Sequence, residues 1–107
     1  MAKRGGFPGG MPGNMNNLMK QAQKMQKQMA ETTKALEEKS YEASAGGGVV
    51  SVTVSGKKEV TAIKIAEEVV DPDDIEMLED LIMAATNEAF RAMEADSQAQ
   101  MSKITGG

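Results

Sequence analysis

The middle of the chain alternates apolar and polar residues with a period of two. From Val50 to Val54, valines alternate with serine and threonine, which predicts a β-strand with one apolar face. A similar alternation runs from Tyr41 to Ala45, and the three glycines at 46–48 are permissive enough to reverse the chain between the two strands. Such glycines can also form a phosphate-binding loop. No Gly-Lys-Ser/Thr follows them and they lead into a strand, which favours a plain connection.

A second turn is expected after the valine strand. Gly56-Lys57 fits the centre of a type II′ turn, because glycine tolerates positive φ at the first central position. This register would pair Val52 with Thr61 and Val50 with Ile63. It predicts one apolar face made of Val50, Val52, Val54, Thr61, Ile63 and Ile65. The three strands would then form an antiparallel meander.

Before the strands, apolar residues recur at spacings of three and four, which predicts one long helix that packs along a narrow seam. The seam consists of Met15, Leu18, Ala22, Met25, Met29, Thr32 and Leu36. Asn14 is a good N-cap, and a helix from Met15 to Lys39 would be about 37 Å long. Six-residue strands reach only about 20 Å, so this helix must extend past its own sheet.

The part of the helix that extends past the sheet would leave its apolar stripe in water. Exposed stripes of this size usually mark an interface, and methionine packs adaptably. We therefore expect a homodimer, with an interface made of Met15, Leu18, Ala22, Met25 and Met29. The alternative is that the carboxy-terminal helix folds back and covers the stripe within one chain.

The last third of the chain predicts a second long helix. Asp71 would cap it and Pro72 would occupy its first position. Apolar residues follow at three-four spacing to about Lys103, namely Ile75, Leu78, Ile82, Ala85, Ala89 and Ala92. The stripe is widened by Met77, Leu81, Phe90 and Met93. The expected fold is α+β in the order α-β-β-β-α. We expect a single domain over 14–107, preceded by a flexible Gly/Pro-rich tail at 1–13.

Composition excludes several kinds of chemistry. The absence of cysteine and histidine excludes disulfides, thiolate chemistry, zinc–sulfur sites and histidine acid/base catalysis. The carboxylates around Asp73 and Glu79 are explained by a helix start, where the helix dipole favours acids. We therefore expect no enzyme, catalytic residue, metal ligand, cofactor or small-molecule substrate. No signal peptide or membrane-spanning segment is indicated, which favours a cytoplasmic protein without membrane contact.

Charge is distributed unevenly along the chain. Residues 1–58 carry nine Lys/Arg against four Asp/Glu, a net +5, whereas residues 59–107 carry three against twelve, a net −9. On the first helix, Lys20, Lys24, Lys27 and Lys34 share one side. A solvated helix face is one interpretation of this stripe. The functional interpretation is a surface that contacts phosphates and releases counterions.

Several blocks of the sequence are informative together: Gly13–Gln26, Glu42–Val50, Asp71-Pro72 with Met77–Ile82, Ala84–Asn87 and Lys103–Gly107. They are spread over nearly the whole chain after residue 13. In their order and spacing, these blocks resemble the YbaB/EbfC family of bacterial nucleoid-associated proteins.

This resemblance implies an α-β-β-β-α subunit, a tweezer-like homodimer and binding of double-stranded DNA with little or modest sequence preference. It also implies a location at the nucleoid and a role in DNA organisation and gene expression. By position, the first helix would supply Lys20, Lys24 and Lys27 to the DNA. By charge, further candidates are Lys3, Arg4, Lys57 and Lys58.

The alternative function is a protein-interaction adaptor, in which the methionine-rich or the acidic helix docks a replication or recombination protein. An adaptor would keep its partners after nuclease treatment, whereas a DNA-binding protein would lose them.

Overall fold

The computed structural model describes residues 6–105, with side chains from Met15 onward. Its elements are α1 (Gly6–Glu37), β1 (Ser40–Ala45), β2 (Val50–Ser55), β3 (Val60–Ile65), the short 3₁₀ helix η2 (Glu67–Val69) and α2 (Ile75–Thr105). The strands form one antiparallel sheet in the order β1-β2-β3. The predicted α+β class, its α-β-β-β-α order and the meander are therefore confirmed.

The core lies between one face of the sheet and α2. The three valines of β2, at 50, 52 and 54, are fully buried against the helix. Ala85 and Ala89 are fully buried as well, because side chains this small let α2 approach the sheet closely. Met93, which the sequence places in the widened stripe, is buried, whereas the predicted Ala92 is exposed.

The predicted glycine turn is confirmed at 46–48, where all three glycines have positive φ. Gly46 also lies against α2, since a Cβ on it would come within 2.8 Å of a Leu81 methyl carbon. A larger residue at 46 would strain the backbone and push against this helix.

The predicted register of the second hairpin is wrong. Val50 pairs with Ile65 and Val52 with Ile63, two residues further along than expected. Gly56 is not among the residues with positive φ, whereas Lys58 has φ 69°. The turn is therefore a three-residue loop that ends in a left-handed residue, followed by a bulge between Thr53 and Val54.

Both predicted helix starts are also wrong. α1 begins at Gly6 rather than Asn14, and Pro8 falls in its first turn, where helices accept proline. The predicted mobility of 1–13 and its division from the domain stay predictions, and residues 1–5 lie outside the described residues. α2 begins at Ile75, because Asp71-Pro72 forms a turn and Asp74 provides the cap. It ends at Thr105, close to the predicted Lys103.

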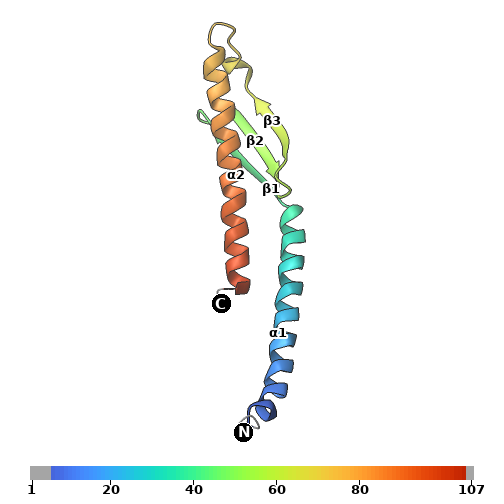
Figure 1. Cartoon of the computed structure of the whole chain (residues 1–107). Helices are drawn as coiled ribbons and strands as arrows, with labels where there is room; N and C mark the ends of the chain where they lie inside the picture. Colours follow the sequence, from blue (N-terminus) through green and yellow to red (C-terminus); the bar gives the residue numbers. More distant parts are fainter. Residues whose placement is uncertain (1–5, 106–107) are drawn as a thin grey trace.

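The molecule is elongated, with extents of 85 × 23 × 18 Å. In Figure 1, α2 lies along the sheet, whereas α1 projects away from the end of the sheet, as its length predicted. At 32 residues, α1 is about 48 Å long, more than twice the reach of a six-residue strand. We call residues 15–31 of α1, whose side chains are all exposed, the arm.

Candidate nucleic-acid interface

The arm carries two faces of opposite character. Successive residues of an α-helix are about 100° apart, so Lys20, Lys24 and Lys27 fall within one narrow stripe. The apolar stripe, from Met15 to Met29, falls on the other side of the helix. It is in line with Leu36, which packs against the rest of the molecule. The lysines therefore face away from the side on which the sheet and α2 lie.

The structure brings Lys20, Lys24 and Lys27 together on exposed helix surface. Within the described residues, the ion pairs join Lys39 to Asp96 and Arg91 to Glu88, so these three arm lysines are unpaired there. Lys34 continues the stripe, but Glu31 lies between it and Lys27. The purely basic surface is thus confined to the outer part of the arm.

The other predicted cations lie elsewhere. Lys57 and Lys58 occupy the β2–β3 loop, and Lys58 lines a pocket together with Leu36, on the side of α1 opposite to the lysine stripe. The structure therefore does not place Lys58 on the same face as the arm lysines. Lys3 and Arg4 lie outside the described residues.

The apolar stripe of the arm is open to solvent. Met15 is 48% exposed, Leu18 58%, Met25 41% and Met29 37%, and Ala22 is exposed as well. The alternative that α2 folds back over these residues within one chain is therefore wrong. Their role in a dimer stays a prediction.

A second apolar surface lies on β3, and sequence reasoning missed its exposure. Ile63 and Ile65 pair with core valines and share their side of the sheet, yet they are 47% and 39% exposed. Val60 on the same strand is 44% exposed. The reason is the position of α2, which packs mainly on β1 and β2 and covers little of β3. An uncovered apolar edge strand favours association with another chain.

A polar cluster lies where α1 meets the rest of the molecule. The Tyr41 hydroxyl donates a hydrogen bond to Asp96 Oδ2 at 2.6 Å, and the Lys39 ammonium contacts the same oxygen at 2.9 Å. Gln100 Nε2 donates to the other carboxylate oxygen at 3.3 Å. Burial, followed by the bond to Asp96, raises the pKa of Tyr41 from 10.0 to about 12. The hydrogen bonds from Tyr41, Lys39 and Gln100 lower the pKa of Asp96 from 3.8 to about 2.

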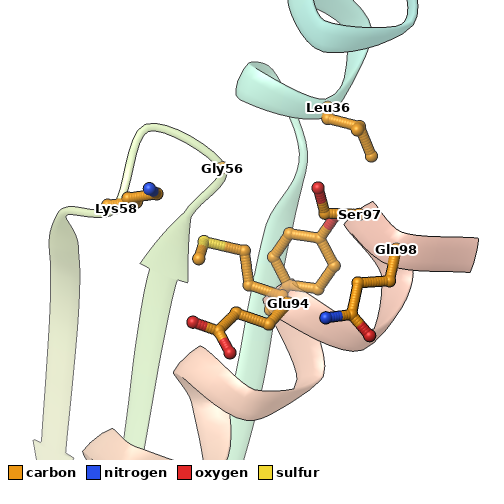
Figure 2. Close-up of a pocket in the computed structure, with 8 residues that line it drawn as sticks. Leu36, Gly56, Lys58, Glu94, Ser97 and Gln98 are labelled. Atoms are coloured by element: carbon orange, nitrogen blue, oxygen red, sulfur yellow. The ribbon is translucent and has the colours of Figure 1, made fainter. Parts of the chain in front are cut away.

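A cavity of about 320 Å³ adjoins this cluster. Figure 2 shows Leu36 from α1, Lys58 from the hairpin loop, and Ser97 and Gln98 from α2 around it. No sequence signal identified this place, because its residues come from four separate segments and follow no common spacing. In the described part of the chain, no group of three or more acidic residues could hold a metal ion. Nor is any described helix long and apolar enough to cross a membrane.

A projecting helix with a lysine face, carried on an α+β body, is one arrangement with which proteins bind nucleic acids. Comparison with known proteins agrees with nucleic-acid binding: the chain belongs to the YbaB/EbfC DNA-binding family, which it matches over residues 11–107. The resemblance seen in the sequence is thereby confirmed.

Similar proteins extend over the whole chain. A nucleoid-associated protein of Agathobacter rectalis is 76% identical over 107 residues, covering 100% of this chain and 95% of its own. A nucleoid-associated protein of Clostridium acetobutylicum is 62% identical, with coverage of 100% and 95%. A crystal structure of an uncharacterized protein from Helicobacter pylori shares the fold, with a TM-score of 0.68 at 21% identity, and covers 85% of this chain and 92% of its own.

Proposed function

We propose that this chain acts at the nucleoid as a non-catalytic homodimer that binds double-stranded DNA with little or modest sequence preference. The observation that carries the proposal is the exposed stripe of Lys20, Lys24 and Lys27 on a helix that projects from the rest of the molecule. Lysines neutralise phosphates and release counterions, which gives affinity without reading sequence. Family membership and the names of the relatives support DNA as the ligand.

The distribution of acids supports the same assignment. The acidic half of the chain forms β3, η2 and α2, whereas the outer arm carries no acidic residue between Met15 and Ala30. A duplex on the lysine face therefore meets positive charge, although the whole chain carries −4. In this proposal Lys3 and Arg4 add secondary, sequence-independent phosphate contacts. Lys57 and Lys58, in a loop away from the lysine face, contact phosphates on another stretch of the DNA.

The homodimer is proposed from the two uncovered apolar surfaces. One is the arm stripe of Met15, Leu18, Ala22, Met25 and Met29, and the other is the exposed β3 face. A second copy of the chain offers matching apolar surfaces, so a two-fold arrangement can cover both copies at once. Such a dimer carries two arms, and two lysine faces then act on one duplex.

The test is fluorescence anisotropy of a labelled random-sequence duplex, titrated with protein at several salt concentrations. We expect log affinity to fall linearly with log salt, with a slope of about 0.9 for each phosphate neutralised. Replacement of Lys20, Lys24 and Lys27 by glutamate should abolish binding and leave the dimer intact. If all three lysines contact phosphates, each arm contributes about 2.7 to the slope of log affinity against log salt.

The matched control makes the same total change in charge, but at positions away from the arm. It replaces Lys64, Arg91 and Lys103 by glutamate, and it should retain most of the affinity. Unchanged affinity of the arm variant, or equal loss in both variants, would overturn the assignment of the arm as the DNA surface.

A further inference from the structure

The connection between the arm and the rest of the molecule is short and tightly held. Only Glu38 and Lys39 separate the end of α1 from the start of β1. Lys39 is held at three points. Its N–H donates to the Leu36 carbonyl at 3.1 Å, its carbonyl accepts from the Gly56 N–H at 3.0 Å, and its ammonium contacts Asp96 at 2.9 Å. The linker therefore has little freedom to change direction.

Gly56 brings the hairpin loop directly against the last turn of α1. A Cβ at position 56 would lie 1.8 Å from the Leu36 carbonyl oxygen and 2.8 Å from the Glu37 Cα. Both neighbours are backbone atoms, so they cannot move aside as a flexible side chain could. The side chain of Leu36 is itself only 7% exposed. Loop and helix end are thus in contact at a site where only glycine fits.

Asp96 connects this contact to α2. Its carboxylate accepts hydrogen bonds from Tyr41 on β1 and from Lys39 in the linker, at 2.6 and 2.9 Å. Three segments that are far apart in sequence, namely 36–41, the loop at Gly56 and α2 at Asp96, therefore meet at the base of the arm. We call Leu36, Lys39, Tyr41, Gly56 and Asp96 the junction cluster.

Besides the junction cluster, α1 also contacts α2 within the subunit. These contacts bury no described side chain of the arm. The side chains at 15–31 are all exposed, and burial begins only near Thr32 and Leu36. Lys20 is 16 residues from Leu36, or about 24 Å along the helix. A tilt of about 10° at the junction would therefore move Lys20 by about 4 Å. A displacement of this size exceeds the length of an ammonium–phosphate contact, about 2.8 Å.

We propose that the junction cluster is a positioning device for DNA binding: it fixes the direction of the arm, so that the lysines of both arms reach the phosphates of one duplex. This inference rests on the proposed function, since it names the residues that make the lysine face effective. The residues of the cluster act through the arm and touch no DNA themselves.

The first test measures the arm direction without DNA. The chain contains no cysteine, so Gln21→Cys on the arm and Glu79→Cys on α2 accept spin labels at two sites only. Both positions are exposed. Labelled chain is diluted with unlabelled chain, so that the distance distribution reports a single subunit. We expect a narrow distribution that broadens or shifts in Asp96→Asn, Tyr41→Phe and Gly56→Ala.

The second test measures duplex affinity for the same substitutions in the unlabelled protein. Asp80→Asn is the matched control, because it also removes one negative charge from α2, at an exposed position away from the junction. Charge alone predicts slightly tighter binding for both asparagine variants. We expect Asp96→Asn to bind more weakly instead, by about eightfold at 0.1 M salt for each phosphate that the arm lysines no longer reach, with a slope shallower by about 0.9. Asp80→Asn should keep the wild-type slope.

The outcomes separate this inference from the proposed function. Failure of the wild-type protein to bind duplex rejects the proposed function and the DNA part of the inference, and the distance distribution alone then decides whether the cluster fixes the arm. Unchanged distances in the junction variants overturn the inference, as does a changed distance with unchanged affinity and slope. If Gly56→Ala fails to fold, the two milder variants still decide.

Discussion

At the scale of single residues, the Tyr41–Asp96 pair makes the junction sensitive to pH at both extremes. Asp96 is ionised in the folded chain down to about pH 2, because three donors stabilise its charge, whereas the unfolded chain protonates it near 3.8. Between these values the unfolded state binds more protons, so stability falls as the pH falls. Tyr41 stays protonated to about pH 12, whereas the unfolded chain releases its proton near 10.0. Over that window the folded state binds more protons, so stability falls as the pH rises.

Tyr41 offers a direct readout of the pair, because it is the single tyrosine of a chain without tryptophan. We expect the near-ultraviolet absorbance of tyrosinate to appear with a midpoint near 12 in the folded protein. In Asp96→Asn the midpoint should move down but stay above 10.0, because burial is the largest cause of the shift. Circular dichroism followed in parallel shows whether the chain is still folded. A midpoint near 10.0 in the folded wild-type protein would contradict the pairing.

At the scale of elements, the sequence pattern correctly predicted those strands and helices that depend on neighbouring residues alone. The valine alternation of β2 and the three-four spacing of the helices require no distant partner, and both were confirmed. The prediction of the second hairpin was wrong because the backbone conformation at Gly56 follows from its contact with Leu36, twenty positions earlier in the sequence. The three-residue loop shifts the register by one residue, and the bulge between Thr53 and Val54 shifts it by one more. No pattern within the hairpin could reveal this contact.

The start of α2 was also predicted wrongly, because its sequence fits two kinds of local structure. Proline suits both the first turn of a helix and the second position of a β-turn, so Asp71-Pro72 predicted a helix start where a turn forms. The Asp71 carboxylate accepts from the Asp73 N–H at 2.9 Å, and Asp74 accepts from the Met77 N–H at 3.2 Å. The second bond has the geometry of an N-cap.

This cap leads to a prediction for stability. Asp74→Ala should cost about 1 kcal/mol, because it leaves a backbone donor at the helix start without its acceptor. For a domain of this size, the loss corresponds to a drop in Tm of roughly 4–8 °C. Thermal unfolding followed by circular dichroism, at one fixed protein concentration, measures it. Asp73→Ala removes a neighbouring carboxylate that is not used as a cap, so equal losses in the two variants would contradict the assignment.

At the scale of the whole molecule, the projection of α1 could be predicted from lengths alone, since a helix of this length cannot lie within six-residue strands. Its direction and the exposure of β3 could not. The direction depends on the contacts of the linker with Gly56 and Asp96, which are distant in sequence. The exposure of β3 depends on how far α2 spreads over the sheet, and the closeness of Ala85 and Ala89 to the valines sets that placement. The apolar surface on β3 is therefore a second candidate for the dimer interface, besides the one predicted on the arm.

Charge substitutions can show which of the two apolar surfaces forms the dimer interface. Leu18→Glu with Met25→Glu places two charges per chain in the arm stripe, where both side chains are exposed in the isolated subunit. We expect a folded monomer at micromolar concentration by light scattering, because burying unpaired charges in a dimer seam is unfavourable. For this variant, the slope of log affinity for the duplex against log salt should fall to about half of the wild-type value, because one arm then acts alone.

Gln21→Glu with Gln28→Glu adds the same charge to the same helix outside the apolar stripe, so this control should remain dimeric. If the arm variant also stays dimeric while Ile63→Glu yields monomers, the interface lies on β3 and the arm stripe is free to contact another partner. A monomeric wild-type protein would reject the homodimer outright. The salt slope would then count the phosphates reached by a single arm, at about 0.9 each.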